Sequence, residues 1–253
     1  MHALIVLAHP EEKSFNAQLA ADAREALTAM GYTVETADLY RDGFDPLEDA
    51  RHFSSRADNA FFSAMIEQRH ASDTGTLPTD VESAIVKLER ADLVVFQFPL
   101  WWWSVPAILK GWFDRVFAWG RVYSSGKRYP DRGHFKGKRA LVSVTTGAPG
   151  LAFGPNGRAG DLDLILWPIH FGLAYVGFSV LPHFASFEVV KGPNTDPDTL
   201  RTRLDGYKAG LRAHLGAIET LEPLKFNTTA DWDETGRLRP TAPSYSPFIR
   251  HVA

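Results

Sequence analysis

One stretch, Asp92–Phe117, limits the folds open to this chain more than any other. A continuous apolar run, Leu93–Phe98, has the composition of a buried strand, and it leads into a loop, Pro99–Ser104, that contains three consecutive tryptophans. A helix is predicted to begin at Val105 and Pro106, because apolar residues then recur at spacings of three and four to the end of the stretch. An apolar strand followed by an amphipathic helix is typical of a parallel sheet that is covered on both faces.

Apolar runs and amphipathic helices alternate along the rest of the chain. Further strands are predicted at Ala3–Ala8, Thr33–Ala37, Ala140–Val144 and Phe178–Leu181. Further helices are predicted over residues 17–30, Asp80–Arg90, Asp161–Tyr175 and about Asp198–Leu221. Because parallel strands are joined by right-handed crossovers, this order predicts an α/β three-layer sandwich around a five-stranded parallel sheet.

The remaining segments have no clear period. Tyr40–Leu77 has mixed polarity, with one helix predicted near Asn59–His70, and Gly120–Lys138 is a polar excursion that contains glycine. No Gly/Ser-rich or Pro-rich linker divides the chain, so we expect a single domain over residues 1–221. The irregular residues 222–253 are expected to form a tail that packs on the same domain.

The composition excludes several classes of function. The 253 residues carry a formal net charge of −3, which gives no electrostatic footprint for nucleic acid. The chain has no cysteine, so disulfides, thiolate catalysis and iron–sulfur clusters are excluded. Any redox chemistry must therefore come from a bound cofactor. No metal-binding motif is found, and no metal site is predicted.

Neither the N-terminus nor the interior predicts a membrane segment. The apolar run near the N-terminus is only six residues long and follows no basic region, so it does not read as a signal peptide. Two uncharged stretches, Leu93–Leu109 and Leu164–Phe187, approach the length of a membrane span, but prolines and polar residues interrupt both. We therefore expect no membrane span and a cytoplasmic location.

Three predicted strands end in loops of distinctive composition: His9–Asn16, Pro99–Ser104 and Thr145–Gly150. In an open α/β sheet such strand ends lie at one edge, where ligands bind. The first loop precedes a helix N-terminus, whose free N–H groups favour an anion such as pyrophosphate. Consecutive indoles cannot all face a core, so at least one should face a flat ligand or a partner chain. The third loop offers hydroxyl and backbone N–H groups suited to the polar edge of a flavin ring.

Each loop alone also has a purely structural interpretation. Ser14 and Asn16 are common helix caps, and His9 could be a structural histidine. Trp101 and Trp103 could pack under the neighbouring helix, and the third loop could be only a turn. The combination of an anion site, an aromatic wall and a polar loop favours a phosphate joined to a large planar ring. The chain has no dinucleotide-binding glycine fingerprint, P-loop, nucleophile elbow or zinc-protease motif.

Four segments carry a resemblance to a known family: LIVLAHPEEKSFN, ADLVVFQFPLWWWSVPAILKGWFDRVF, the TTG of Thr145–Gly147 and LILWPIHFG. They resemble the NAD(P)H:quinone oxidoreductase (DT-diaphorase) family of flavodoxin-like flavoproteins, in register from Ala3 to about Leu181. The resemblance implies a flavodoxin-like fold and a homodimer with FAD at the subunit interface. It also implies a ping-pong reaction, in which hydride passes from NADH or NADPH to flavin N5 and then to a quinone, or to an azo or nitro electrophile.

The resemblance also implies a role for each loop. The FAD phosphates and ribityl chain would be held by His9, Ser14, Phe15 and Asn16. The isoalloxazine ring would be lined by Pro99, Leu100, Trp101, Trp102 and Trp103, and its polar edge by Thr145, Thr146, Gly147 and Ala148. The substrate pocket would be shaped by Trp103, Tyr123, Phe153 and Tyr175, some of them contributed by the opposite subunit.

Two regions depart from the family pattern. Family members of the mammalian type place a tyrosine and a histidine against the flavin edge, where this chain has Phe153 and Ala159. Neither side chain can donate a hydrogen bond, so flavin reduction should be slower than the family norm unless another group, for which Arg158 is the candidate, substitutes. In the last helix Gly210 stands where the family can place an arginine toward the adenine, with Arg212 nearby. This departure keeps FMN open as an alternative to FAD.

These departures leave a second class of function open. The chain could be a flavin-binding regulatory or electron-transfer subunit of a partner protein such as an ion-efflux system. A cofactor-free binding protein on the same scaffold is disfavoured, because all three loops keep chemistry that suits a flavin. No residue that would select NADH or NADPH is located.

Overall fold

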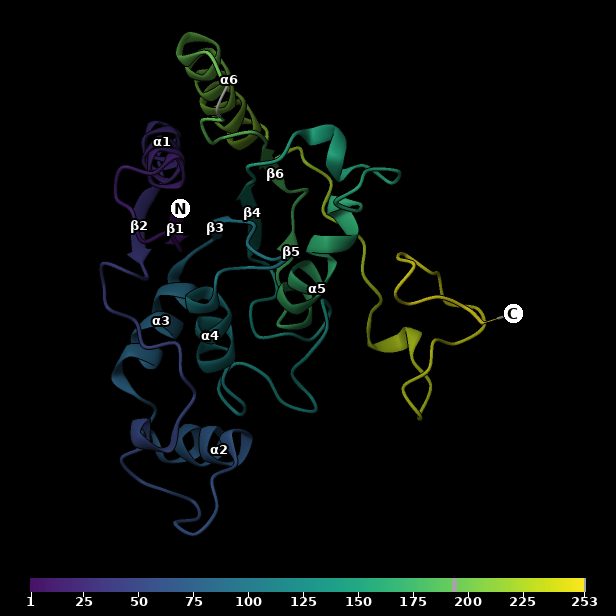
Figure 1. Cartoon of the computed structure of the whole chain (residues 1–253). Coiled ribbons are helices and arrows are strands. Elements are labelled where there is room, and N and C mark those ends of the chain that lie inside the picture. The colour runs from purple at the N-terminus through teal and green to yellow at the C-terminus, as the bar shows by residue number, and fades with distance from the viewer. Residues whose placement is uncertain (193–194, 253) are drawn as a thin grey trace.

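A parallel sheet forms the centre of the computed structural model, which describes residues 1–192 and 195–252 (Figure 1). Its strands are β1 (His2–Leu7), β2 (Thr33–Asp38), β3 (Leu93–Pro99), β4 (Arg139–Thr145), β5 (Ser179–Val180) and β6 (Phe184–Ser186). The order is β2-β1-β3-β4-β5, and β6 also pairs with β4. All pairs are parallel, so the strands end at one common edge.

Helices cover both faces of the sheet (Figure 1). One face carries α1 (Phe15–Ala29) and α6 (Pro197–Gly216), and the other carries α3 (Thr79–Arg90), α4 (Ala107–Val116) and α5 (Leu162–Tyr175). One further helix, α2 (Ala64–Thr74), lies beyond α3 and α4, away from the sheet. An apolar cluster fills the space on each side of the sheet. The predicted α/β three-layer sandwich is therefore confirmed.

The two faces of β3 explain its uninterrupted apolar sequence. Val94 and Phe96 belong to the apolar cluster shared with α3 and α4, whereas Leu93 and Val95 belong to the cluster shared with α1 and α6. Every residue of β3 is buried. A central parallel strand needs apolar side chains on both faces, because helices exclude water from each.

The edge of the sheet differs from the sequence prediction. The fifth strand is shorter than predicted, and the extra strand β6 was not expected. Pro182 separates the two, and both continue the same side of β4: β5 pairs with its first residues and β6 with Ser143–Thr145. Proline has no N–H for a ladder, so a break in an edge strand there has a direct cause.

Two helix boundaries also differ. The helix predicted near Asn59–His70 is α2, which begins five residues later, at Ala64. The delay arises because the Asp58 carboxylate accepts hydrogen bonds from the N–H groups of Ala60 and Phe61 and fixes a turn. The last helix ends at Gly216, before the predicted Leu221, and turns follow it.

The tail runs away from the sandwich beside α5 and ends in an irregular lobe (Figure 1). Its first part continues the sheet edge, where the N–H of Leu224 donates to the carbonyl of Val180 at 2.8 Å. Further along, Phe248 stacks on Trp167 of α5 at 4.7 Å between ring centroids. These contacts support the proposal that the tail belongs to the same domain. None of the helices that the structure describes is long and apolar enough to cross a membrane.

Candidate functional site

Three loops meet at the carboxyl edge of the sheet. β1, β3 and β4 are neighbours, and each runs directly into one of the loops that the sequence singled out. Pro99 pairs with Thr145, and the N–H of Leu100 donates to the Thr145 carbonyl at 2.8 Å. The tryptophan loop and the Thr145–Gly150 loop are therefore fixed side by side by backbone hydrogen bonds.

A buried polar network ties the loop after β1 to the other two. The Asn16 amide donates to Thr145 Oγ1 at 2.9 Å and accepts from Gln97 Nε2 at 2.8 Å. All three side chains are buried. The side chain of Asn16 therefore joins the start of α1 to the ends of β3 and β4, and Gln97, which the site prediction had missed, is part of this network. Its signal in the sequence was a lone polar residue inside an apolar strand.

The loop after β1 keeps donors for an anion. Ser14 caps α1, and its hydroxyl oxygen accepts from the N–H of Ala17 at 3.1 Å. The first N–H groups of a helix have no partner within the helix, so those of Phe15 and Asn16 remain available. The Glu11 N–H donates to His9 Nδ1 at 3.0 Å. A neutral imidazole that accepts at Nδ1 carries its proton on Nε2, and His9 can then donate to the same anion.

The tryptophan loop is a tight turn with an unusual backbone. Trp101 and Ser104 exchange two backbone hydrogen bonds of 3.0 Å, and the two residues between them, Trp102 and Trp103, have φ of 50° and 57°. Residues other than glycine rarely adopt this left-handed backbone conformation, and residues that do so tend to cluster at functional sites. Trp101, Trp102 and Trp103 are 41%, 91% and 55% exposed, so the interpretation that Trp101 and Trp103 pack under the neighbouring helix is wrong.

A cavity of about 410 Å³ lies between the tryptophan loop and the loop after β4. It is lined by Leu100, Trp102, Trp103, Thr146, Gly147, Ala148, Phe153, Arg158 and Ala159. Trp103 Nε1 donates to the Ala159 carbonyl at 2.6 Å and joins the two walls. This volume and this mixture of aromatic and small polar groups are typical of a site for a planar cofactor.

The wall formed by the loop after β4 presents backbone donors. The Thr146 hydroxyl donates to the Ala148 carbonyl at 2.9 Å, which folds the loop back on itself. Within the described residues, the N–H groups of Gly147 and Ala148 donate no hydrogen bond. They are therefore available to the polar edge of a ring in the cavity.

Arg158 brings the one positive charge among the residues that line this cavity. It is exposed, and in the part of the chain that the structure describes it forms no ion pair. Phe153 and Ala159 line the same cavity, but their side chains offer it no donor. Arg158 thus lines the same cavity as Phe153 and Ala159, and its role as a substitute for the missing tyrosine and histidine stays a prediction.

The four residues predicted to shape the substrate pocket are not all brought together. Trp103 and Phe153 line the cavity, but Tyr123 and Tyr175 do not. These two tyrosines lie 6.2 Å apart, ring to ring, in a separate aromatic cluster with Tyr129 and Trp232 of the tail. Burial, and to a lesser degree the neighbouring Tyr175, raise the pKa of Tyr123, so its hydroxyl stays protonated at neutral pH.

The residues considered for the adenine end have other partners. Arg212 donates to Asp22 on α1 at 2.8 Å, and this ion pair raises the pKa of Arg212. Gly210 faces Phe184, because an added Cβ would lie 3.4 Å from that ring. Arg212 is therefore engaged with Asp22, and Gly210 has no side chain that could take the place of the family's arginine at the adenine end.

Comparison with known proteins agrees with this geometry. A family described as having a flavodoxin-like fold matches residues 1–211. The chain is 42% identical over 211 residues to NAD(P)H dehydrogenase (quinone) 1 of Rattus norvegicus, which covers 83% of this chain and 76% of the relative. It is 43% identical over 186 residues to ribosyldihydronicotinamide dehydrogenase (quinone) of Mus musculus, covering 73% and 80% of the two chains. A crystal structure of a candidate quinone reductase from Klebsiella pneumoniae superposes with a TM-score of 0.86, at 34% identity and over 97% of each chain.

This chain therefore belongs to the flavodoxin-like fold family. Within it, the chain groups with the NAD(P)H and ribosyldihydronicotinamide quinone dehydrogenases, as the resemblance of its motifs predicted.

Proposed function

We propose that this protein is an FAD-dependent NAD(P)H:quinone oxidoreductase that works as a homodimer. It is an enzyme, a flavin-dependent oxidoreductase of the quinone-reducing type. The observation that carries the proposal is the cavity at the strand ends, with its tryptophan wall and free backbone donors, in a chain 42% identical to a rat NAD(P)H dehydrogenase (quinone). A bound flavin supplies the redox chemistry: it accepts a hydride from the nicotinamide and passes two electrons to the acceptor.

The protein's own groups bind and orient this cofactor. The N–H groups of Phe15 and Asn16, with His9, would hold its phosphates at the start of α1. The exposed tryptophans would stack on the ring and exclude water from one face. The N–H groups of Gly147 and Ala148 would donate to its polar edge, and Arg158 would place a positive charge where negative charge develops during reduction.

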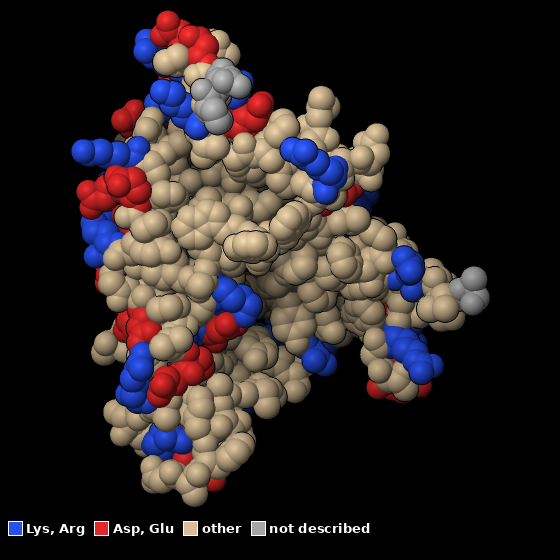
Figure 2. Space-filling view, in the orientation of Figure 1, with Lys and Arg blue, Asp and Glu red and all other residues tan. Residues whose placement is uncertain are grey.

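The separation of Tyr123 and Tyr175 from the cavity of their own chain supports a homodimer. Tyr123 and Tyr175 lie outside the cavity of their own chain, so they would reach the cavity of a second copy. An apolar groove between α4 and α5 offers a surface for that contact, and Phe113, Phe117 and Ile169 line it. Uncharged residues also cover a broad part of the face in Figure 2, although one group of opposite charges lies close to its middle. Depletion of charge is typical of the core of a subunit interface.

The cofactor is proposed to be FAD, with FMN as the alternative. The support for FAD is the sequence similarity to the quinone dehydrogenases, which extends through the strand-end loops. Against it stand Gly210 and the engagement of Arg212 with Asp22, which leave the adenine end without the expected cation. Release of the cofactor by denaturation, followed by chromatography, separates the two. The acceptor is proposed to be a quinone, or an azo or nitro compound of similar planarity.

A regulatory or electron-transfer subunit is the competing function. The observation that favours it is the lack of side-chain donors at Phe153 and Ala159, which suits slow turnover. Fast multiple turnover with a simple quinone supports the enzyme, whereas stoichiometric capture on an immobilised membrane partner supports the subunit.

The test of the proposal is an anaerobic absorbance titration of the purified protein with NADPH and with NADH, followed by a benzoquinone. The proposal expects a bound flavin that bleaches in one two-electron step and recovers its colour with the quinone. A colourless protein that binds neither FAD nor FMN would refute it, and the tryptophan loop would then have to bind a partner protein.

A further inference from the structure

Helix α2 holds the loop that leads to Tyr123, and it does so through the backbone N–H and carbonyl of Trp119. The N–H of Trp119 donates to Gln68 Oε1 at 3.1 Å, and the carbonyl of Trp119 accepts from Ser72 Oγ at 2.9 Å. Gln68 and Ser72 are four residues apart, so they lie on the same face of α2. Both backbone groups of Trp119 are thus bound by side chains of one helix.

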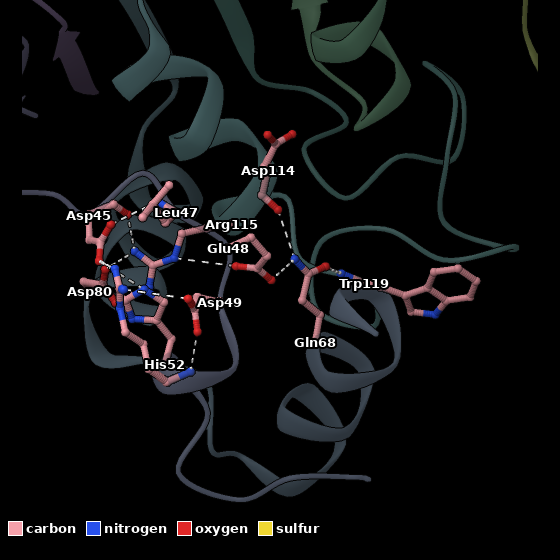
Figure 3. Close-up of polar contacts among 11 residues, drawn as sticks. Asp45, Leu47, Glu48, Asp49, His52, Gln68, Asp80, Asp114, Arg115 and Trp119 are labelled. Carbon is pink, nitrogen blue, oxygen red and sulfur yellow. Dashed lines mark hydrogen bonds and ion pairs between the residues drawn. The ribbon is translucent and has the colours of Figure 1, made fainter. Parts of the chain in front are cut away.

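Gln68 is itself fixed in place. Its Nε2 atom donates to Glu48 Oε1 at 2.8 Å and to the carbonyl of Asp114 at 3.0 Å, while its Oε1 accepts from Trp119 (Figure 3). The side chain is buried, and every hydrogen of the amide is used. A buried amide with this set of partners cannot turn without leaving a buried group unpaired.

The partners of Gln68 belong to a larger polar network around the buried Arg115 (Figure 3). Arg115 of α4 is 1% exposed, donates to both oxygens of Asp80 at 2.6 and 3.1 Å, and lies 3.6 Å from Glu48. Its guanidinium also donates to the Asp45 carbonyl at 2.7 Å and lies over the ring of Phe44. A buried arginine needs such compensation, so the segment around Phe44–Glu48 is tied to the end of α4.

A short turn couples the position of Tyr123 to that of Trp119. The N–H of Gly120 donates to the carbonyl of Tyr123 at 2.8 Å, and the rings of Trp119 and Tyr123 lie 5.8 Å apart. Gly120 has φ of +90°, and an added Cβ would lie 2.9 Å from Arg69 Cδ and 3.0 Å from Ser72 Cβ. The turn therefore packs directly on α2, and a shift of α2 must move it.

We propose that α2 is a positioning element for the acceptor pocket and that Gln68 and Ser72 are its positioning residues. The proposal rests on the proposed function, in which Tyr123 shapes the pocket of the partner subunit. Neither residue touches the cavity in its own chain. Their role is to set where the Tyr123 ring stands, and hence which acceptors fit.

The test compares Ser72→Ala and Gln68→Leu with a control, Thr202→Ala, in the flavin-loaded protein. Thr202 also donates its hydroxyl to a carbonyl at 2.9 Å, but it does so within α6. The first measurement is amide hydrogen exchange of the peptide that spans Trp119–Tyr123. The loss of one hydrogen bond in Ser72→Ala should speed exchange there about fivefold. Thr202→Ala should leave it unchanged.

The second measurement is a split of kcat and KM with a one-ring and a two-ring quinone. Both α2 variants should raise KM for the two-ring quinone about fivefold and KM for the one-ring quinone less, so the ratio of the two KM values changes, because a loosened Tyr123 alters the fit of the larger acceptor most. Flavin content and kcat should stay within twofold of the unaltered protein. If Gln68→Leu fails to fold, Ser72→Ala carries the test alone.

The outcomes separate this inference from the proposed function. Faster exchange at Trp119–Tyr123 with unchanged KM values would overturn the positioning role while the oxidoreductase stands. Unchanged exchange in Ser72→Ala would show that the hydrogen bond from Ser72 does not hold Trp119 in place, and the proposal would fall. An unaltered protein that turns over no quinone would instead overturn the proposed function, and the positioning role with it.

Discussion

The cavity at the strand ends and the aromatic cluster around Tyr123 are built in different ways. The cavity wall formed by Trp103 and the loop after β4 stands on the sheet itself, where backbone pairing and the buried Asn16 network fix it. The aromatic cluster stands on an excursion between α4 and β4, held by α2 on one side and by the tail ring Trp232 on the other. The cavity wall is anchored directly to the sheet, whereas the aromatic cluster depends on side-chain contacts at the periphery.

This difference indicates that the two regions have separate roles. A cofactor that stays bound through every cycle needs high affinity, and a rigid site favours it because binding then has no loose loop to order. A pocket that receives and releases acceptors tolerates a wall that other elements adjust. Changes in the cavity should therefore alter flavin binding and reduction, and changes in the aromatic cluster should alter how acceptors fit.

The largest effect is expected for Asn16→Leu. The substitution leaves the buried amide of Gln97 and the hydroxyl of Thr145 without their partner, at a cost of roughly 1–3 kcal/mol each. We expect a lower free energy of unfolding in urea and loss of bound flavin on gel filtration. Asn227→Leu is the matched control, because Asn227 is also buried but donates to the Pro243 carbonyl within the tail. Equal loss of flavin in both variants would contradict the idea that the cavity network, and not the periphery, fixes the flavin.

The next effect is a loss of stability in acid. Burial lowers the pKa of His170 on α5 to about 3, from 6.5 in the unfolded chain. The unfolded state therefore binds more protons between these values, so the contribution is complete above pH 6.5 and is lost as the pH falls toward 3. Burial also lowers the pKa of His183, whose ring stacks on His170, so both residues act in the same direction.

Urea unfolding between pH 7.5 and 5 measures this effect. The unfolding free energy should fall by about 1.4 kcal/mol per pH unit for each such proton below pH 6.5. His170→Gln removes one titrating group and should flatten the slope. A slope that is the same in the variant and the unaltered protein would show that His170 does not contribute.

A smaller effect is expected for Arg158→Gln. Removing a fixed positive charge from the polar side of the cavity should slow flavin reduction by NAD(P)H about tenfold, since the site is exposed and partly screened. Stopped-flow absorbance under anaerobic conditions measures the rate. The control is Arg201→Gln on α6, which removes an exposed arginine that pairs only with Asp198 among the described residues. An unchanged rate and midpoint potential would end the idea that Arg158 substitutes for the missing donors.

The smallest effect is expected for Trp103→Phe. The change keeps a ring in the cavity but removes the donor to the Ala159 carbonyl, so flavin should dissociate about fivefold faster. Trp102→Phe is the matched control, since Trp102 lines the same cavity and its indole forms no hydrogen bond within the described residues. The rise of flavin fluorescence after dilution of the loaded protein follows the rate of dissociation. Equal effects of the two changes would mean that the hydrogen bond to Ala159 is unimportant.

Much of the fold could be predicted because the central strands are apolar on both faces. LVVFQF and ALIVLA leave few alternatives to a buried parallel strand, and the helices between them keep a regular apolar face. The edge of the sheet was harder to predict, because β6 is only three residues long and its pairing depends on its place beside β4. The start of α2 is set by a turn at Asp58, which periodicity does not register.

The candidate site could be predicted in its composition but only partly in its arrangement. The order of the strands brings the three loops together, as parallel topology requires. The inward direction of the Asn16 side chain depends on Gln97 and Thr145, which are distant in sequence, so no local pattern indicates it. The separation of Tyr123 and Tyr175 from the cavity is likewise a tertiary property, visible only when the chain is folded.

The most direct test of a site shared between two subunits is a subunit-mixing experiment. One variant, Gly147→Val, changes the cavity wall, because Gly147 lines the cavity and an added Cβ would already lie 3.2 Å from Val190. The other, Tyr123→Ala with Tyr175→Ala, removes the aromatic cluster. Each should be nearly inactive alone, whereas unfolding and refolding them together should restore about one quarter of the unaltered activity, since half of the dimers are hybrids with one intact site. Hybrid dimers that form, as native mass spectrometry shows, but regain no activity would contradict the shared site.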